Sequence, residues 1–278
     1  MPPGSLLWYN IYCRSICFCF TLYNFFRHGA SPCDRKGRHE MQQIYTIPIK
    51  EHFGREGEAR TKCPCPICSL YRMFEENELD IILGASMMEP DIRIKTNKLG
   101  FCRMHYDMMF VRKNRLGMAL TLESHLDKLR REITDLPLTV PGTRARARIE
   151  ELRGSCYVCE RIEHNFSNLL ENIVYLWDTE EEFREMFAKQ DMFCLPHYAD
   201  LLGTAKAKLS GKRYREFAKA AEAVVLPYFD KLSGDVSWFC KKFDYRYDKE
   251  PWYDSKDAVE RAIKFLRSDM HNNEDKKD

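Results

Sequence analysis

A ligand motif that occurs twice is the feature that most constrains this chain. Four C-x-x-C or C-x-x-H pairs make up the motif: Cys65 with Cys68, Cys102 with His105, Cys156 with Cys159, and Cys194 with His197. The C-x-x-C pairs are offset by 91 residues (65 to 156), and the C-x-x-H pairs are offset by 92 (102 to 194). Phenylalanine precedes and tyrosine follows each C-x-x-H pair. We interpret the pattern as an internal duplication.

Each repeat supplies three cysteines and one histidine, which is a ligand set that structural zinc sites use. We predict two structural zinc ions, with Cys65, Cys68, Cys102 and His105 around one of them and the second set around the other. Cys63 is an alternative to Cys65 as a ligand. An iron–sulfur cluster on the same thiolates is an alternative cofactor, and a thiol redox protein is an alternative function. For any single pair, buried helix cysteines with satisfied histidines are the better explanation, whereas the doubled set of eight residues favours metal ligands.

The run PCPIC from Pro64 to Cys68 has the form of a zinc deaminase motif, which also needs an H-x-E ligand and proton shuttle. No histidine in the chain is followed by glutamate two residues later. Four protein ligands also leave no position for a reactive water. The sequence therefore favours structural metal sites and no enzymatic activity.

The front of the chain does not resemble the rest. Residues 5–26 are apolar enough to suggest a membrane helix, but Arg14 lies in their middle, and no basic start or cleavage site marks a signal peptide. The codons of Lys36 to Arg38 can form a purine run like that of a bacterial ribosome-binding site, just before Met41. We predict that Met41 is the native start, that residues 1–40 are a non-native or disordered extension, and that the protein is cytoplasmic without membrane contact.

Apolar residues at helical spacing follow both C-x-x-C pairs and both C-x-x-H pairs. They predict helices that end near Gly84, run from Ala119 to Ile133, and run from Ile162 to Trp177. A further stripe from Tyr214 to Leu232 contains Pro227, which we expect to kink the helix or begin a new one. The stretch 137–142 contains proline and glycine, which break helices, and we predict that it is a linker. We predict a first helical metal-binding repeat at 41–140, a second at 141–232, and an aromatic segment, closing helix and charged tail at 233–278.

The aromatic segment mixes rings with charges, a combination that can stack a base or a planar ligand and that also occurs in ordinary cores. The candidate ligand-binding residues are Trp238, Lys241, Lys242, Asp244, Tyr245 and Arg246. An enzyme with its site near this segment is a further alternative, and it would need charged groups with shifted pKa values. The net charge of +2 gives no sign of a dedicated nucleic-acid protein.

From Met41 onward the chain resembles an uncharacterised bacterial family, a domain of unknown function. The motifs that carry the resemblance are residues 44–48 (IYTIP), 65–68 (CPIC), 88–93 (MEPDIR), 100–105 (GFCRMH), 114–117 (NRLG), 238–246 (WFCKKFDYR) and 255–258 (SKDA). The resemblance implies no activity. We therefore expect an all-α protein of two related helical modules, each with three cysteines and one histidine, followed by an aromatic segment and a helix. Its expected role is to bind a protein or nucleic-acid partner.

Overall fold

The computed structural model describes residues 45–57, 63–134 and 140–271. No strand occurs within these ranges, which confirms the prediction of an all-α fold. Residues 1–40, with the apolar stretch 5–26 and the predicted start at Met41, lie outside the described residues, as does the first half of the predicted linker. In the described part of the chain, no helix has both the length and the apolar character needed to cross a membrane.

The helices follow one another with short connections. Helical residues 45–53 come first. The α-helices after them are α4 (Pro66–Leu83), α5 (Pro90–Leu99), α6 (Arg103–Val111), α7 (Arg115–Ile133), α8 (Thr143–Arg153), α9 (Tyr157–Thr179), α10 (Glu181–Ala188), α11 (Leu195–Lys208), α12 (Gly211–Lys241) and α13 (Ala258–Arg267). Short 3-10 helices are η2 (Ala85–Met88), η3 (Tyr245–Tyr247) and η4 (Tyr253–Ser255). The helices predicted before Gly84, from Ala119 to Ile133 and from Ile162 to Trp177 correspond to α4, α7 and α9.

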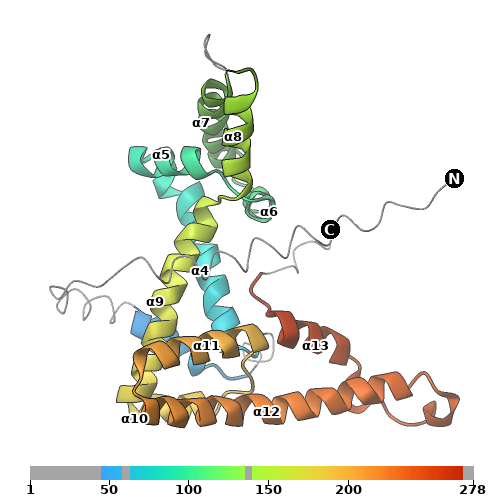
Figure 1. The fold of residues 1–278 in the computed structure, drawn as a ribbon. Coiled ribbons are helices and arrows are strands. Elements are labelled where there is room, and N and C mark those ends of the chain that lie inside the picture. The colour runs from blue at the N-terminus through green and yellow to red at the C-terminus, as the bar shows by residue number, and fades with distance from the viewer. Residues whose placement is uncertain (1–44, 58–62, 135–139, 272–278) are drawn as a thin grey trace.

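Two long helices, α4 and α9, pack against each other and form the axis of the molecule (Figure 1). Pro66 occupies the first turn of α4, where its fixed φ favours a helix start, and Gly84 follows the last residue. The touching faces are apolar: Leu70 on α4 and both Leu169 and Ile173 on α9 are fully buried. The pair therefore behaves as a stiff connection between the two ends of the molecule.

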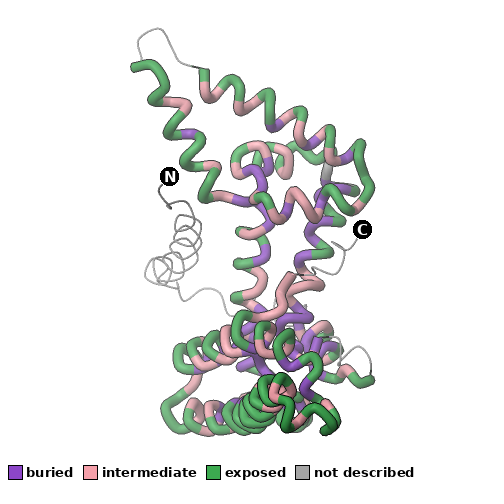
Figure 2. The backbone as a smooth tube through the Cα atoms, turned by 90° about the vertical axis from the view of Figure 1, so that its right-hand side faces the viewer, coloured by how far each residue is buried: buried purple, intermediate pink, exposed green. Residues whose placement is uncertain are grey.

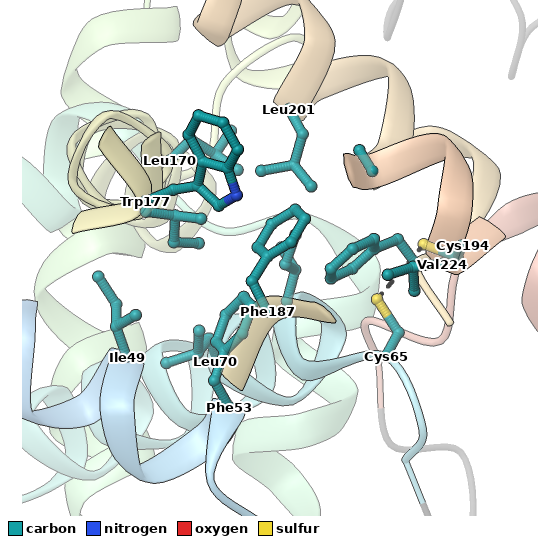
Figure 3. Close-up of a cluster of buried hydrophobic side chains, with 14 of the residues drawn as sticks. Ile49, Phe53, Cys65, Leu70, Leu170, Trp177, Phe187, Cys194, Leu201 and Val224 are labelled. Atoms are coloured by element: carbon teal, nitrogen blue, oxygen red, sulfur yellow. Dashed lines mark hydrogen bonds between the residues drawn. The ribbon is translucent and has the colours of Figure 1, made fainter. Parts of the chain in front are cut away.

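The larger core surrounds one end of this axis, where α10, α11, α12 and the helical residues 45–53 gather (Figures 1 and 2). Phe187 lies near its centre, with its ring centroid 4.8 Å from that of Phe193 and 5.5 Å from that of Phe217. Trp177 contacts Phe217 edge to face at 5.0 Å. Figure 3 shows that Cys65 and Cys194 lie at the edge of this aromatic cluster. Burying such rings contributes about 1.5–3 kcal/mol each to folding.

A smaller core occupies the other end of the axis, under α5, α6 and α7. Leu79 and Ile82 of α4 pack there with Met109 of α6. Helix α8 is held in place by the nearly buried Arg148, which pairs with Glu132 at 2.6 Å and with a second glutamate on α8. This end of the molecule is therefore held by polar contacts as well as by its core.

The last long helix differs from the prediction. Helix α12 continues through Pro227 to Lys241, so the proline does not begin a new helix. The boundary that we placed after residue 232 falls inside α12, and the aromatic segment begins as a continuation of that helix. The closing helix is present as α13.

Candidate metal centres

The eight predicted ligands lie in two groups. Site 1 consists of Cys65, Cys68, Cys194 and His197; site 2 consists of Cys102, His105, Cys156 and Cys159. Within each group the candidate ligand atoms all lie within 4.8 Å of one another. Each site thus combines the C-x-x-C pair of one repeat with the C-x-x-H pair of the other. The prediction that Cys65 and Cys68 share a site with Cys102 and His105 was wrong.

Helix length explains the exchange. Helix α4 has 18 residues, and at 1.5 Å per residue it spans about 27 Å. It begins directly after Cys65, and site 2 lies beside its later turns, where His105 contacts Glu75 about 15 Å along the helix, so Cys65 and Cys102 do not share an ion. Helix α9 has 23 residues and separates Cys156 from Cys194 in the same way. Because α4 and α9 run side by side in opposite directions, each end of the pair brings together ligands from both repeats (Figure 1).

All four pairs stand at helix N-termini. The residues that immediately precede α4, α6, α9 and α11 are Cys65, Cys102, Cys156 and Cys194. The second ligand of each pair lies three residues later, in the first helical turn, on the same side as the first. Unsatisfied backbone N–H groups and the helix dipole make a helix N-terminus favourable for a thiolate. Two such N-termini meet at each site.

The distances in site 1 fit four ligands around a single small ion. Cys194 Sγ is 3.9 Å from Cys65 Sγ and 3.6 Å from Cys68 Sγ. His197 Nδ1 is 3.1 Å, 3.4 Å and 3.7 Å from the sulfurs of Cys194, Cys68 and Cys65. A tetrahedral zinc ion with Zn–S of about 2.3 Å and Zn–N of about 2.0–2.1 Å requires about 3.8 Å between sulfurs and about 3.5 Å from sulfur to nitrogen.

Site 2 has the same geometry. Cys102 Sγ is 4.0 Å from Cys159 Sγ. His105 Nδ1 lies 3.1 Å from Cys102 Sγ, 3.3 Å from Cys156 Sγ and 3.5 Å from Cys159 Sγ. In both sites the histidine directs its Nδ1 atom toward the sulfurs. This orientation is expected, because the histidine lies in the first turn of a helix and its paired cysteine immediately precedes that helix.

The thiols of each site cannot all ionise together unless a cation balances them. Burial raises the pKa of Cys65, but hydrogen bonds with Cys194, Cys68 and His197 outweigh it and hold that pKa well below its usual range. The hydrogen bond with Cys194 raises the pKa of Cys68 well above its usual range. In site 2 the hydrogen bond with Cys156 lowers the pKa of Cys102 strongly, while contact with Cys102 raises that of Cys159. A bound divalent cation would remove this competition, since metal ligation requires deprotonated thiolates.

Cys63 is not part of site 1. Its thiol is buried and contacts the carbonyl of Cys65 at 3.6 Å, and burial raises its pKa to about 11. The structure therefore places Cys65, and not Cys63, in the ligand group.

Residues outside the motif also contact the sites, and the sequence analysis missed them. Glu75 on α4 is 1% exposed, and its Oε1 is 3.0 Å from His105 Nε2. His271 Nδ1 approaches the same oxygen at 2.8 Å. The backbone N–H of Asp269 donates to Cys68 Sγ at 3.4 Å. No spacing in the sequence signals these contacts, because the partners are up to 201 residues apart.

Four of the six candidate ligand-binding residues of the aromatic segment form bonds within that segment. Lys242 Nζ donates to three backbone carbonyls, at Tyr247, Asp248 and Glu250, over 2.6–3.0 Å. Trp238 Nε1 donates to the carbonyl of Pro251 at 3.0 Å. Asp244 and Arg246 pair with each other at 2.6 Å. Of the remaining two, Tyr245 is 88% exposed, and Lys241 Nζ lies 6.0 Å from the Trp238 ring centroid.

These features define a class: a helical protein with two compact groups of three cysteines and one histidine that can each hold a metal ion. Within that class, the chain belongs to the family of unknown function DUF6062, whose model matches residues 41–273. The match agrees with the family resemblance from Met41 onward. No curated protein and no solved structure matches the chain.

Proposed function

We propose that the protein binds one structural zinc ion at each site and acts as a non-enzymatic binding or adaptor protein. The observation that supports this most directly is the set of sulfur–sulfur distances of 3.6–4.0 Å, which suits four ligands on one ion. An iron–sulfur cluster attaches its cysteines to different iron atoms, so its ligands stand farther apart than those of a single ion. The compact groups therefore favour zinc over the cluster.

A structural role follows from the closed coordination. Three thiolates and one imidazole complete a tetrahedron, which leaves no position for a substrate or a reactive water. The ligands of site 1 are at most 1% exposed. A metal ion here would join helix ends that are far apart in the sequence. The free energy of metal binding would therefore add to the free energy of folding.

The rival proposal of an enzyme near the aromatic segment gains no support from the charges there. Hydrogen bonds from the Arg246 side chain and backbone lower the pKa of Asp244, which opposes a role as a general acid. Large exposed rings in this segment, such as Phe243 at 77% and Tyr245 at 88%, suit a protein-binding surface better. We therefore place the partner-binding surface at this end of α12.

Metal analysis tests the proposal. Protein purified without added metal and without air should contain two zinc ions per chain and show no visible absorbance band. Iron together with inorganic sulfide would refute the zinc assignment and support the cluster. A chelator should remove the zinc and unfold the helices, as followed by circular dichroism; a chain that stays fully folded without metal would refute the structural role.

A further inference from the structure

One short segment reaches both sites. Residues 269–271, which follow α13 and which we name the strap, place the Asp269 N–H 3.4 Å from Cys68 Sγ of site 1. Two residues later, His271 Nδ1 is 2.8 Å from Glu75 Oε1, which in turn contacts His105 of site 2. The strap thus donates a hydrogen bond directly to Cys68 of site 1 and is connected to His105 of site 2 through the Glu75 carboxylate.

Several contacts fix the strap on α4. Arg72 Nε donates to the carbonyl of Asp269 at 2.8 Å, and its guanidinium pairs with the Asp269 carboxylate at 2.6 Å. Lys264 pairs with the same carboxylate at 3.1 Å. The ring of His271 stands edge-on to that of Tyr71, with centroids 5.6 Å apart. Met270, between them, packs against the larger core. The strap is therefore held independently of any metal.

At site 2 the strap acts through Glu75. A carboxylate that accepts the outer N–H of a ligating histidine fixes the tautomer, orients the ring and raises its basicity toward the metal. An isolated carboxylate at 1% exposure would be costly to keep charged. His271 supplies the second hydrogen bond that offsets this cost. Burial alone would raise the pKa of Glu75, but the hydrogen bonds with His105 and His271 lower it overall.

At site 1 the strap acts on a sulfur. Three thiolates and one divalent cation carry a net charge of −1 inside a buried site, and a backbone N–H directed at one sulfur stabilises that charge. Because Arg72 holds Asp269 through both its carbonyl and its carboxylate, the direction of this N–H depends on Arg72.

We propose that the strap is a shared clamp that sets how tightly both sites retain their metal, with Glu75 and His271 as positioning residues for site 2 and with Asp269 and Arg72 for site 1. The segment would then act on each ion separately, on site 1 through the Asp269 N–H and on site 2 through His271. The inference rests on the proposed function, because it concerns retention of the ions that the two sites would hold.

The affinity of each site for zinc tests the clamp, measured on the full chain by competition with a chromogenic chelator. Cys68→Ser leaves only site 2 to be measured, and Cys159→Ser leaves only site 1. Glu75→Gln keeps the shape of the side chain and removes its charge, and Glu76→Gln, at the next, exposed position of α4, is the matched control. His164→Ala, which removes an exposed histidine, is the control for His271→Ala.

Glu75→Gln and His271→Ala should each weaken zinc binding at site 2 by about 10- to 100-fold, the usual effect of losing such a partner, with site 1 unchanged. Arg72→Ala should weaken site 1 and spare site 2. Affinities equal to those of the controls would overturn the proposal. An equal loss at both sites from every variant would indicate general destabilisation and would overturn it too. Wild-type protein without two zinc ions would instead refute the proposed function itself.

Discussion

Replacing two cysteines at once should show which ligands share an ion. Cys68→Ser leaves site 1 with three ligands and should reduce the zinc content from two ions to one. Adding Cys194→Ser should cause no further loss, because Cys194 Sγ lies 3.6 Å from Cys68 Sγ in the same site. Adding Cys102→Ser instead should remove the second ion, because Cys102 belongs to site 2, whose His105 contacts α4 at Glu75, about 15 Å along the helix from Cys65.

The two double variants should also differ in stability. Structural zinc contributes an apparent 10–16 kcal/mol in small zinc-binding peptides, about as much as the entire stability of a typical domain. The first double variant should therefore be about as stable as Cys68→Ser alone, while the second should lose the helices at both ends of the axis. Zinc content by mass spectrometry and thermal unfolding by circular dichroism measure both effects. If the variant with Cys194→Ser lost two ions and the one with Cys102→Ser lost one, the ligands would pair within repeats and the crossed sites would be refuted.

Three further outcomes follow from the structure. If a protease site is inserted between α7 and α8 and cut, the two fragments should elute together in size-exclusion chromatography until a chelator is added, and separation before chelation would refute metal bridging between repeats. Phe217→Ala, at a fully buried ring, should lower the free energy of unfolding by about 3–5 kcal/mol in denaturant titrations and leave both ions bound. His52 is buried and its pKa is lowered to about 4. Between pH 6.5 and 4 the imidazole of His52 is protonated in the unfolded chain but not in the folded one. The free energy of unfolding should therefore fall by about 2 kcal/mol on acidification to pH 5, and His52→Gln should remove that part of the pH dependence.

The local structure and the ligand set were predictable from the sequence, but the pairing was not deduced. Helical spacing and the stop at Gly84 indicated α4 in advance, and the ligand spacing identified all eight members of the two groups. The predicted helix after Cys68 carries the chain away from Cys65, and the structure places His105 beside Glu75, ten residues beyond Cys65.

The contacts around the ligands were not predictable in the same way. Glu75 occupies an ordinary position on α4, and its partner His271 is 196 residues away. Lys242 illustrates the opposite failure: a cation among aromatic rings suggested a ligand site, whereas its donors satisfy three backbone carbonyls of the turn after α12. Periodicity shows which face of a helix is buried, but the partner of an individual polar group depends on the tertiary arrangement.

The crossed sites also show how the two copies of the ligand motif become parts of one structure. The C-x-x-C pair of each repeat shares a site with the C-x-x-H pair of the other repeat. A twofold axis produces the same reciprocal contact between identical subunits. Neither copy can close a site alone. The symmetry is broken next to the ligands: adding the 91-residue offset to position 75 gives position 166, where Phe166 packs its ring 5.4 Å from that of His197, while Glu75 bonds to His105. One imidazole thus has a carboxylate neighbour and the other a phenyl ring. Because a carboxylate raises the basicity of a ligating histidine, the two groups would differ in their affinity for metal, although they have the same four types of ligand.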